Sequence, residues 1–388
     1  MSNKNISALI KLVLGLFICI SLFGCQEKED IQIVDPEIGI DIEPQAILEP
    51  IEEEPQYSYT VSLHALDEGY DVYSPPEGAN GYRYGPSIMY YEDGSMDAWF
   101  SRPGNNSTMW DYISYRHSDD GIEWSDEEIV LRPTAGADDH YSCCDPGVIY
   151  FDGYYYLGYT SARSSKNGGE DNCAFVARSE NPNGPFEKWD GEGWGGDPVA
   201  IIEYDEDPNF WGAGELSFVV KDEDLFIYCS WDNSAGNYTR VYKADLVENW
   251  PATIRYKNYD LPHEKGQDSL DVAYVEEYDT FIGVAVCFRY TEASCLTIYN
   301  SSDGIHFEEV DTISHNIHEY CHNCGLSKMP NGHIDRDDKL VLGYAYGSKW
   351  GRWYTRFHEV ELMSQRKESA NSYIFQMKKY KIKIGGNL

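Results

Sequence analysis

The sequence predicts an all-β protein, a five-bladed β-propeller with four-stranded antiparallel blades around a central channel. The first observation is the segment Asp145–Ser161, where a short apolar run, the pair Asp152-Gly153 and a longer aromatic run follow one another. Asp-Gly between two runs of β-forming residues is typical of a two-residue hairpin turn, because both turn residues tolerate positive φ. The second observation is that helical periodicity is nearly absent from the chain.

The third observation is a repeat. The unit of short strand, turn and longer strand occurs five times, at intervals of 54 to 70 residues. A period this long, with several strands in each unit, indicates propeller blades rather than the coils of a solenoid. The first strand of a blade lines the channel, and its opening residue should point into the funnel at one end. We expect these openers to be Gly85, Asp145, Glu215, Asp271 and Gly325.

The beginning of the chain predicts export. Residues 1–24 read as a lipoprotein signal peptide, in which the apolar run leads into Leu22-Phe-Gly-Cys25. This resembles a bacterial lipobox with Cys25 as the lipidated residue, and the alternative is a transmembrane anchor, for which the run is short. Residues 25–55 form an acidic, proline-containing linker, and residues 56–388 form the propeller. We therefore expect a bacterial lipoprotein of the outer membrane or cell surface, periplasm-facing or outward-facing, with membrane contact through the lipid alone.

The net charge of the chain limits the classes of molecule that it is expected to bind. The chain has 66 acidic and 30 basic side chains, and its net charge of −36 repels nucleic acid and anionic lipid. A strongly anionic polysaccharide is a less favoured substrate, although a local basic pocket could still bind one. The 32 tyrosines suit both β-sheets and stacking against sugar rings. We expect a monomer that binds carbohydrate and no nucleic acid.

Three of the expected openers carry carboxylates, and neighbouring blades would bring Asp145, Glu215 and Asp271 to one site. Hydrolysis of a glycosidic bond needs a protonated acid for the leaving oxygen and an ionised carboxylate for water or the anomeric carbon. Crowding carboxylates raises the pKa of at least one of them, which supplies the acid at neutral pH. The plainer alternative is that the aspartates merely cap turns.

Several motifs resemble a known family. They are Cys-Asp145-Pro-Gly-Val-Ile, Gly-Ala-Gly-Glu215-Leu-Ser-Phe, the turn Asn-Pro-Asn-Gly-Pro-Phe and the Asp-Gly turns. Over residues 82–362 the chain resembles the five-bladed β-propeller glycoside hydrolases, family 43-like and related to families 32 and 117. The resemblance implies that Glu215 is the general acid and Asp145 its supporting carboxylate. The general base of blade one is replaced by Gly85, and we expect Asp271 to supply the missing carboxylate.

The same resemblance suggests substrate contacts. The segment Cys321-His-Asn-Cys-Gly325 is similar to the one with which arabinan-cleaving relatives hold a central metal ion, so His322 is a candidate calcium-associated or sugar-contacting residue. We expect no cofactor to be required, with a structural Ca²⁺ in the channel left open. The expected substrate-binding residues are Arg83, Tyr84, Trp211, Trp231, His322 and Arg352. Plainer alternatives are core packing for the tryptophans and a structural ion pair for Arg83.

Eight cysteines follow Cys25. In an exported protein they are expected to form disulfides or to be buried thiols. A zinc site from Cys321 and Cys324 with His318 or His322 is the less favoured alternative, because the Cys-x-x-Cys occurs once.

Together these features predict a glycoside hydrolase acting on a plant or algal poly- or oligosaccharide, with an arabinofuranoside, xyloside or galactoside as the candidate linkage. The main alternative is a non-catalytic carbohydrate-binding propeller that has lost its base at Gly85. A lyase or transferase on the same scaffold is a third class, since a fold does not fix chemistry.

Overall fold

The computed structural model describes residues 58–106, 109–162 and 169–367. The predicted signal peptide, the lipidation site Cys25 and the acidic linker lie outside this part of the chain. The chain divides between Pro55 and Gln56, and every described residue belongs to the second unit. Its helices are the two short 3₁₀ turns η2 (Trp250–Thr253) and η3 (Glu276–Tyr278), and no helix among the described residues is long and apolar enough to cross a membrane.

The strands form antiparallel meanders, which we call blades in chain order. Blade one contains β3 (Tyr84–Tyr90), β4 (Met96–Asn106), β5 (Met109–Ser118) and β6 (Glu128–Leu131). Blade two contains β7 (Cys144–Phe151), β8 (Tyr154–Ala162), β9 (Asn172–Ser179) and β10 (Glu187–Lys188). Blade three contains β11 (Gly212–Lys221), β12 (Asp224–Asn233), β13 (Gly236–Asp245) and β14 (Arg255–Pro262). Blade four contains β15 (Leu270–Val275), β16 (Thr280–Cys287), β17 (Cys295–Ser301) and β18 (Glu308–Ile313).

The last blade combines the two ends of the described chain. It contains β19 (Cys321–Leu326), β21 (Leu340–Lys349), β22 (Arg352–Arg366) and, as its outer strand, β1 (Tyr59–Ala65). β1 pairs antiparallel with β22, from Tyr59 opposite Arg366 to Ala65 opposite Val360. Two short strands are accessory: β2 (Tyr70–Tyr73) pairs with β22, and β20 (His333–Ile334) runs parallel to β15. β1 therefore closes the ring by completing the last blade.

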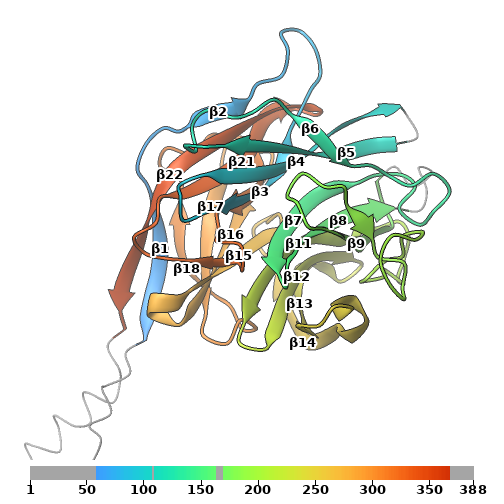
Figure 1. Ribbon diagram of the computed structural model, residues 1–388. Coiled ribbons are helices and arrows are strands. Elements are labelled where there is room, and N and C mark those ends of the chain that lie inside the picture. The colour runs from blue at the N-terminus through green and yellow to red at the C-terminus, as the bar shows by residue number, and fades with distance from the viewer. Residues whose placement is uncertain (1–57, 107–108, 163–168, 368–388) are drawn as a thin grey trace, which may run out of the picture. The chain divides into compact units, whose positions relative to one another are not determined.

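The first strands of the blades pack side by side in a ring, in the order β3, β7, β11, β15, β19 and back to β3. Figure 1 shows β3, β7, β11 and β15 near the middle of the view, with β6, β14 and β18 toward the edge. The predicted all-β propeller with antiparallel four-stranded blades is confirmed.

The Asp-Gly hairpin signal is also confirmed. Asp152 and Gly153 have φ values of 50° and 84°, and Phe151 pairs with Tyr154 across them. Both turn residues thus occupy the left-handed region that a type I′ hairpin requires.

The hydrophobic core lies between adjacent blades. Phe226 of blade three meets Phe281 of blade four with ring centroids 4.9 Å apart, and Phe100 of blade one stacks on Phe357 of blade five. Both faces of each blade are therefore covered, which explains why most strand residues are buried rather than alternating.

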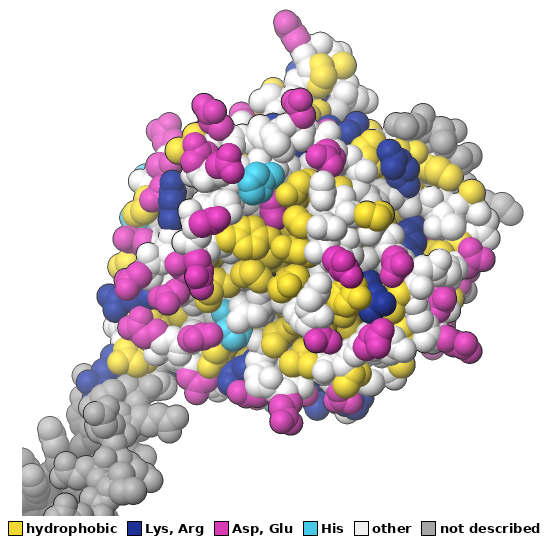
Figure 2. Space-filling model, viewed as in Figure 1, with side chains coloured by type: hydrophobic (Ala, Val, Ile, Leu, Met, Phe, Trp, Pro, Cys, Tyr) yellow, Lys and Arg dark blue, Asp and Glu magenta, His cyan; other side chains and the backbone are white. Residues whose placement is uncertain are grey.

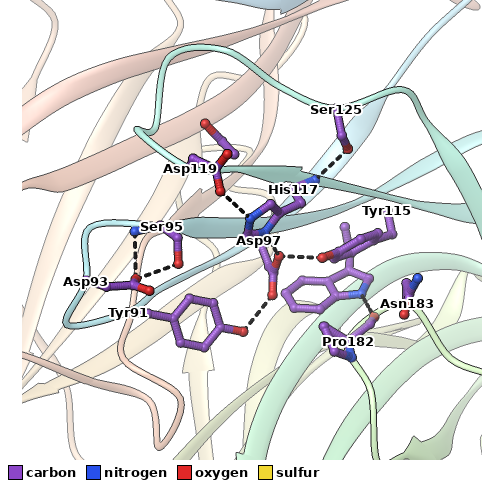
Figure 3. Close-up of polar contacts among 12 residues, drawn as sticks. Tyr91, Asp93, Ser95, Asp97, Tyr115, His117, Asp119, Ser125, Pro182 and Asn183 are labelled. Carbon is purple, nitrogen blue, oxygen red and sulfur yellow. Dashed lines mark hydrogen bonds and ion pairs between the residues drawn. The ribbon is translucent and has the colours of Figure 1, made fainter.

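A buried carboxylate of blade one is held by three side chains of the same blade, and a neighbouring tryptophan bonds to blade two (Figure 3). Asp97 on β4 is 2% exposed and accepts hydrogen bonds from the hydroxyls of Tyr115 (2.5 Å) and Tyr91 (2.6 Å). His117 Nδ1 lies 2.8 Å from the same carboxylate. The neighbouring Trp99 donates its indole N–H to the Pro182 carbonyl of blade two at 2.9 Å. These bonds satisfy a charge that burial would otherwise penalise.

Candidate active site

The openers of the inner strands share one backbone conformation. Gly85, Asp145, Glu215 and Asn323 have φ values of 56°, 51°, 50° and 44°. Each lies at an irregularity where its strand skips a pairing with the next strand of the blade. A left-handed backbone at a bulge changes the direction in which the side chain points. Gly, Asn and Asp adopt this conformation more readily than Glu does. Glu215 therefore holds a strained backbone at this point, as functional residues often do.

Two of the openers are anchored in the same way. The amide of Asp145 donates to Ser101 Oγ (2.7 Å), and the amide of Glu215 donates to Thr160 Oγ1 (2.8 Å). In both cases the hydroxyl comes from the second strand of the preceding blade. Neighbouring blades thus fix where each carboxylate enters the channel.

This register corrects the expected openers of blades four and five. Gly325 lies two residues past the true opener Asn323 and corresponds to Gly147, since a Cβ on either glycine would meet a carbonyl oxygen of the next inner strand within 2 Å. In blade four, Asp271 lies at the position that Gly147 and Gly325 occupy in blades two and five, since the amides of Val148 and Val272 both donate to a serine hydroxyl of the preceding inner strand. β15 pairs with β16 without a bulge. The carboxylate that blade four adds beside Glu215 belongs to Asp268, which the sequence did not single out.

Asp271 makes a buried ion pair. Its carboxylate lies 2.6 Å from Lys328 Nζ, and it also accepts bonds from Ser217 Oγ (2.7 Å) and the Leu326 amide (2.8 Å). Lys328 is 5% exposed. Asp271 thus lines the channel cavity together with Asp145 and Glu215, as expected, but its carboxylate is held in an ion pair and hydrogen bonds between blades three, four and five.

Asp268 is buried and held by cationic and amide donors. Arg289 Nη1 lies 2.9 Å from Oδ1, and the amide of Asn323 donates to Oδ2 at 3.1 Å. Burial opposes ionisation of Asp268, but Arg289, His322, the Asn323 amide and a hydrogen bond with Glu215 together hold its pKa below the ordinary value. This carboxylate is the permanent negative charge of the site.

The pKa values of the two openers that carry carboxylates, Glu215 and Asp145, are raised rather than lowered. Burial raises the pKa of Glu215 well above its ordinary value, and the charges of Asp268 and Asp145 raise it further. Burial, together with the charge of Asp268, raises the pKa of Asp145 to about 6, although hydrogen bonds with Cys144 and Thr160 act against the rise. At neutral pH the site thus combines a protonated Glu215 with ionised Asp268 and Asp145.

A histidine orients the protonated acid through Asn323. His322 is 1% exposed, and burial lowers its pKa to about 4, so the ring is neutral. Its Nδ1 lies 2.7 Å from Asn323 Oδ1, and Asn323 Nδ2 donates to Glu215 Oε1 at 3.1 Å. The chain of bonds assigns the His322 proton to Nδ1. Its Nε2 is buried and has no partner among the described residues.

Aromatic rings surround His322 at the channel mouth. Trp353 and Tyr290 lie with centroids 4.3 Å and 4.9 Å from the imidazole, and Tyr84 lies 5.9 Å away. Trp350 extends this wall outward and is 67% exposed. The channel cavity lined by the openers is only about 30 Å³, room for a water but not for a sugar ring. A sugar would therefore bind at the mouth, against these rings.

A fourth carboxylate lies behind blade one's opener. Asp111 on β5 accepts hydrogen bonds from the hydroxyls of Tyr82 and Tyr84, both at 2.6 Å. Burial raises the pKa of Asp111 to about 7 against the effect of those two bonds, and Asp145 raises it further. A Cβ on Gly85 would make ordinary van der Waals contact with Asp145, 3.4 Å from its Cα, and the φ of 56° favours glycine there.

The remaining predicted substrate contacts are dispersed. Arg83 forms an ion pair with Glu127 and covers Tyr73, as its structural alternative proposed. Trp231 is 2% exposed beneath the Arg240 guanidinium, so the structure places it in the core rather than at a sugar. Trp211 lies just before β11 and is partly exposed, while Arg352 lines a separate pocket on blade five.

The eight described cysteines are buried free thiols. Among the described residues, no group of three or more His, Cys, Asp or Glu side chains could hold a metal ion. His322 is occupied at Nδ1 by Asn323, and Asp268 by Arg289. His322 Nε2 has no partner among the described residues, and the structural Ca²⁺ of the channel stays a prediction.

Comparisons with known proteins find the same fold in solved structures of glycoside hydrolases. No protein-family profile matches the chain. A family 117 glycoside hydrolase, Zg3597 from Zobellia galactanivorans, aligns over 83% of this chain and 98% of its own, with 14% identity and a TM-score of 0.55. An endo-arabinase from Bacteroides thetaiotaomicron aligns over 74% and 96%, with 15% identity and a TM-score of 0.51. An α-L-arabinofuranosidase from Podospora anserina aligns over 79% and 97%, with 10% identity and a TM-score of 0.53. At these identities the likeness shows the fold alone.

A curated protein sequence is also similar to this chain. It is the A type blood N-acetyl-α-D-galactosamine deacetylase of Flavonifractor plautii, 24% identical over 308 residues. The alignment covers 66% of this chain but only 36% of that protein, so this chain spans about a third of its relative's length.

Proposed function

We propose that this protein is a carbohydrate hydrolase, and specifically a glycoside hydrolase that acts on a poly- or oligosaccharide at the mouth of the propeller channel. The observation that carries the proposal is the opposite shift of neighbouring carboxylates: the pKa of Glu215 is raised and that of Asp268 is lowered. Titratable groups pushed apart in this way supply an acid and a permanent charge at one pH. The similar solved structures support the carbohydrate substrate, since arabinan- and arabinoside-cleaving enzymes share the fold.

The roles follow from the contacts. Glu215 donates its proton to the leaving glycosidic oxygen, with Asn323 bonded to Oε1 so that the proton resides on Oε2. Asp145 is ionised above about pH 6 and activates the water. Asp268, fixed by Arg289, keeps Glu215 protonated. This assigns the base to Asp145, in place of the Asp271 expected from the sequence.

The test is release of sugar. The protein is incubated with arabinan, xylan and galactan oligosaccharides, and new reducing ends are measured for the parent and for Glu215→Gln. Release by the parent and its loss in the variant support the proposal. Binding of these sugars with no turnover of any linkage in the parent would instead support a carbohydrate-binding propeller.

Amide hydrolysis is a second candidate, because the curated relative is an N-acetylgalactosamine deacetylase. The same site would serve it: a base for water, an acid for the leaving nitrogen, and the Asn323 and Arg289 donors for a developing oxyanion. Free acetate from N-acetylated oligosaccharides, measured beside reducing ends, separates the two reactions.

We also propose that the chain is a lipoprotein anchored through Cys25, on the strength of the Leu-Phe-Gly-Cys motif. Cys25→Ser should move the protein from the membrane fraction to the soluble fraction. Retention of the variant on washed membranes would contradict the anchor.

A further inference from the structure

A second pocket lies on the rim of blade five, apart from the channel. Its volume is about 500 Å³, within the range of small-ligand sites. Both the loop before β19 and the turn between β21 and β22 contribute to it. We call it the rim pocket, and its walls include His318, Glu319, Tyr346, Lys349, Arg352 and Tyr354.

Three stacked rings form one wall of the rim pocket. His318 lies parallel to Tyr346, with centroids 4.1 Å apart and an interplanar angle of 8°. Tyr354 stacks near Tyr346 at 5.2 Å and 24°. All three side chains are partly exposed. Rigid, half-exposed aromatic faces of this kind suit the apolar face of a sugar ring.

Two cations without acidic partners line the same pocket. Lys339, just before β21, pairs with Glu359 (3.5 Å), and Arg356 on β22 pairs with Asp71 (2.9 Å). By contrast, Lys349 and Arg352 have no carboxylate within 4.0 Å among the described residues, although the exposed Glu319 also lines the pocket. The contrast is informative in a chain of net charge −36, where Figure 2 shows acidic side chains spread over the face in view. An anionic group is the ligand that two uncompensated cations favour.

A series of side-chain contacts runs from the rim pocket to the residues of the channel mouth. Trp350 lies in the hairpin between Lys349 and Arg352, and its ring contacts Trp353 at 4.9 Å. Trp353 in turn contacts His322, which is bonded to Asn323 of the site. One hairpin therefore presents the aromatic wall of the mouth and the cations of the pocket.

We infer that the rim pocket binds an anionic sugar residue of the substrate chain, one bearing a carboxylate or a sulfate, while the scissile linkage lies at the channel mouth. This rests on the proposed function of the channel. It identifies the substrate class as an acidic poly- or oligosaccharide, despite the negative charge of the protein as a whole.

The experiment measures binding, not turnover. In the full chain carrying Glu215→Gln, calorimetry compares an oligogalacturonate, a sulfated galactan oligosaccharide, a neutral galactan oligosaccharide of equal length, and sodium sulfate. We expect at least one of the two acidic oligosaccharides to bind about tenfold tighter than the neutral one, as a charge-assisted bond permits. The one that binds tighter identifies the anionic group.

Lys349→Gln with Arg352→Gln should abolish that preference and leave neutral binding unchanged. Lys257→Gln is the matched control, since it removes a partly exposed cation of blade three that also has no carboxylate within 4.0 Å among the described residues. Equal binding of acidic and neutral chains, equal loss in the control, or sulfate binding as tightly as the oligosaccharides would overturn the inference. Because the readout is binding to an inactive variant, absence of hydrolysis by the parent would contradict the proposed function without affecting this result.

Discussion

Asn323 Nδ2 donates a 3.1 Å hydrogen bond to Glu215 Oε1, and thereby joins the openers of blades five and three across the channel. In a protonated carboxyl the carbonyl oxygen is the better acceptor for an amide N–H, which favours the proton of Glu215 on Oε2. Asn323 therefore selects the oxygen from which the acid donates. The left-handed backbone at Asn323 is one that Asp also tolerates, so the contact can be altered without a change of shape.

We expect Asn323→Asp to lower kcat about tenfold, because the donor is lost and a new carboxylate faces Glu215. Glu215→Gln should lower it further, by on the order of 10²–10⁴. Sugar release and thermal unfolding are measured together. Glu361→Gln, at an exposed acid of β22 outside the channel and the rim pocket, is the control. Full activity in Asn323→Asp would show that the bond does not orient the acid.

The pH dependence should be bell-shaped. Ionised Asp145, with a pKa of about 6, sets the acidic limb of kcat/KM, and protonated Glu215 sets the alkaline limb. The charge of Asp268 raises both pKa values, so Asp268→Asn should shift both limbs to lower pH. Glu361→Gln, an exposed acid on blade five, should leave them in place. Unshifted limbs in Asp268→Asn would contradict the coupling.

Asp271→Asn should affect stability before activity. The substitution leaves Lys328 buried without its counter-charge, which costs about 3 kcal/mol in the free energy of unfolding. Chemical denaturation should show this loss and a partial recovery in the double variant Asp271→Asn with Lys328→Met. If instead turnover disappears while stability is unchanged, Asp271 belongs to the chemistry, as the sequence first predicted.

Stability should also depend on His117. Its hydrogen bond to Asp97 outweighs burial and raises the pKa of His117 above its unfolded value. The stabilisation is therefore complete below the unfolded pKa of about 6.5 and is lost as pH rises through the folded pKa. The difference in unfolding free energy between the parent and His117→Gln should shrink from pH 6 to pH 9. A constant difference would show that the His117 charge contributes nothing.

Local sequence predicted the repeat, the hairpins and three of the openers, Gly85, Asp145 and Glu215. Asp152-Gly153 determines its own turn, and the runs beside it have no helical period, so the blades could be recognised without long-range information. Asp145 and Glu215 were found because each directly precedes such a run.

The other residues of the site depend on register. Asp271 repeats the first residue of Asp145-Pro-Gly, and Gly325-Leu-Ser repeats the Leu-Ser of Glu215-Leu-Ser. In blade five the bulge places the opener at Asn323, and in blade four β15 pairs with β16 without a bulge. One signal was available: Gly147 and Gly325 both come two residues after an opener, where the next strand leaves no room for a Cβ. Arg289 and Asp111 lie on other parts of the blades, and only the folded sheet brings them to the channel.

The pairing of β1 with β22 determines when the ring of blades can close during synthesis. Its partner β22 is the last strand of the described chain, and Lys367 donates its amide to the Ser58 carbonyl at 2.8 Å. The first strand to leave the ribosome therefore waits, unpaired, until nearly the whole chain has been made. Closing so long a loop is slow compared with forming hairpins. A chain exported as we propose would stay open at this seam until both ends had crossed the membrane.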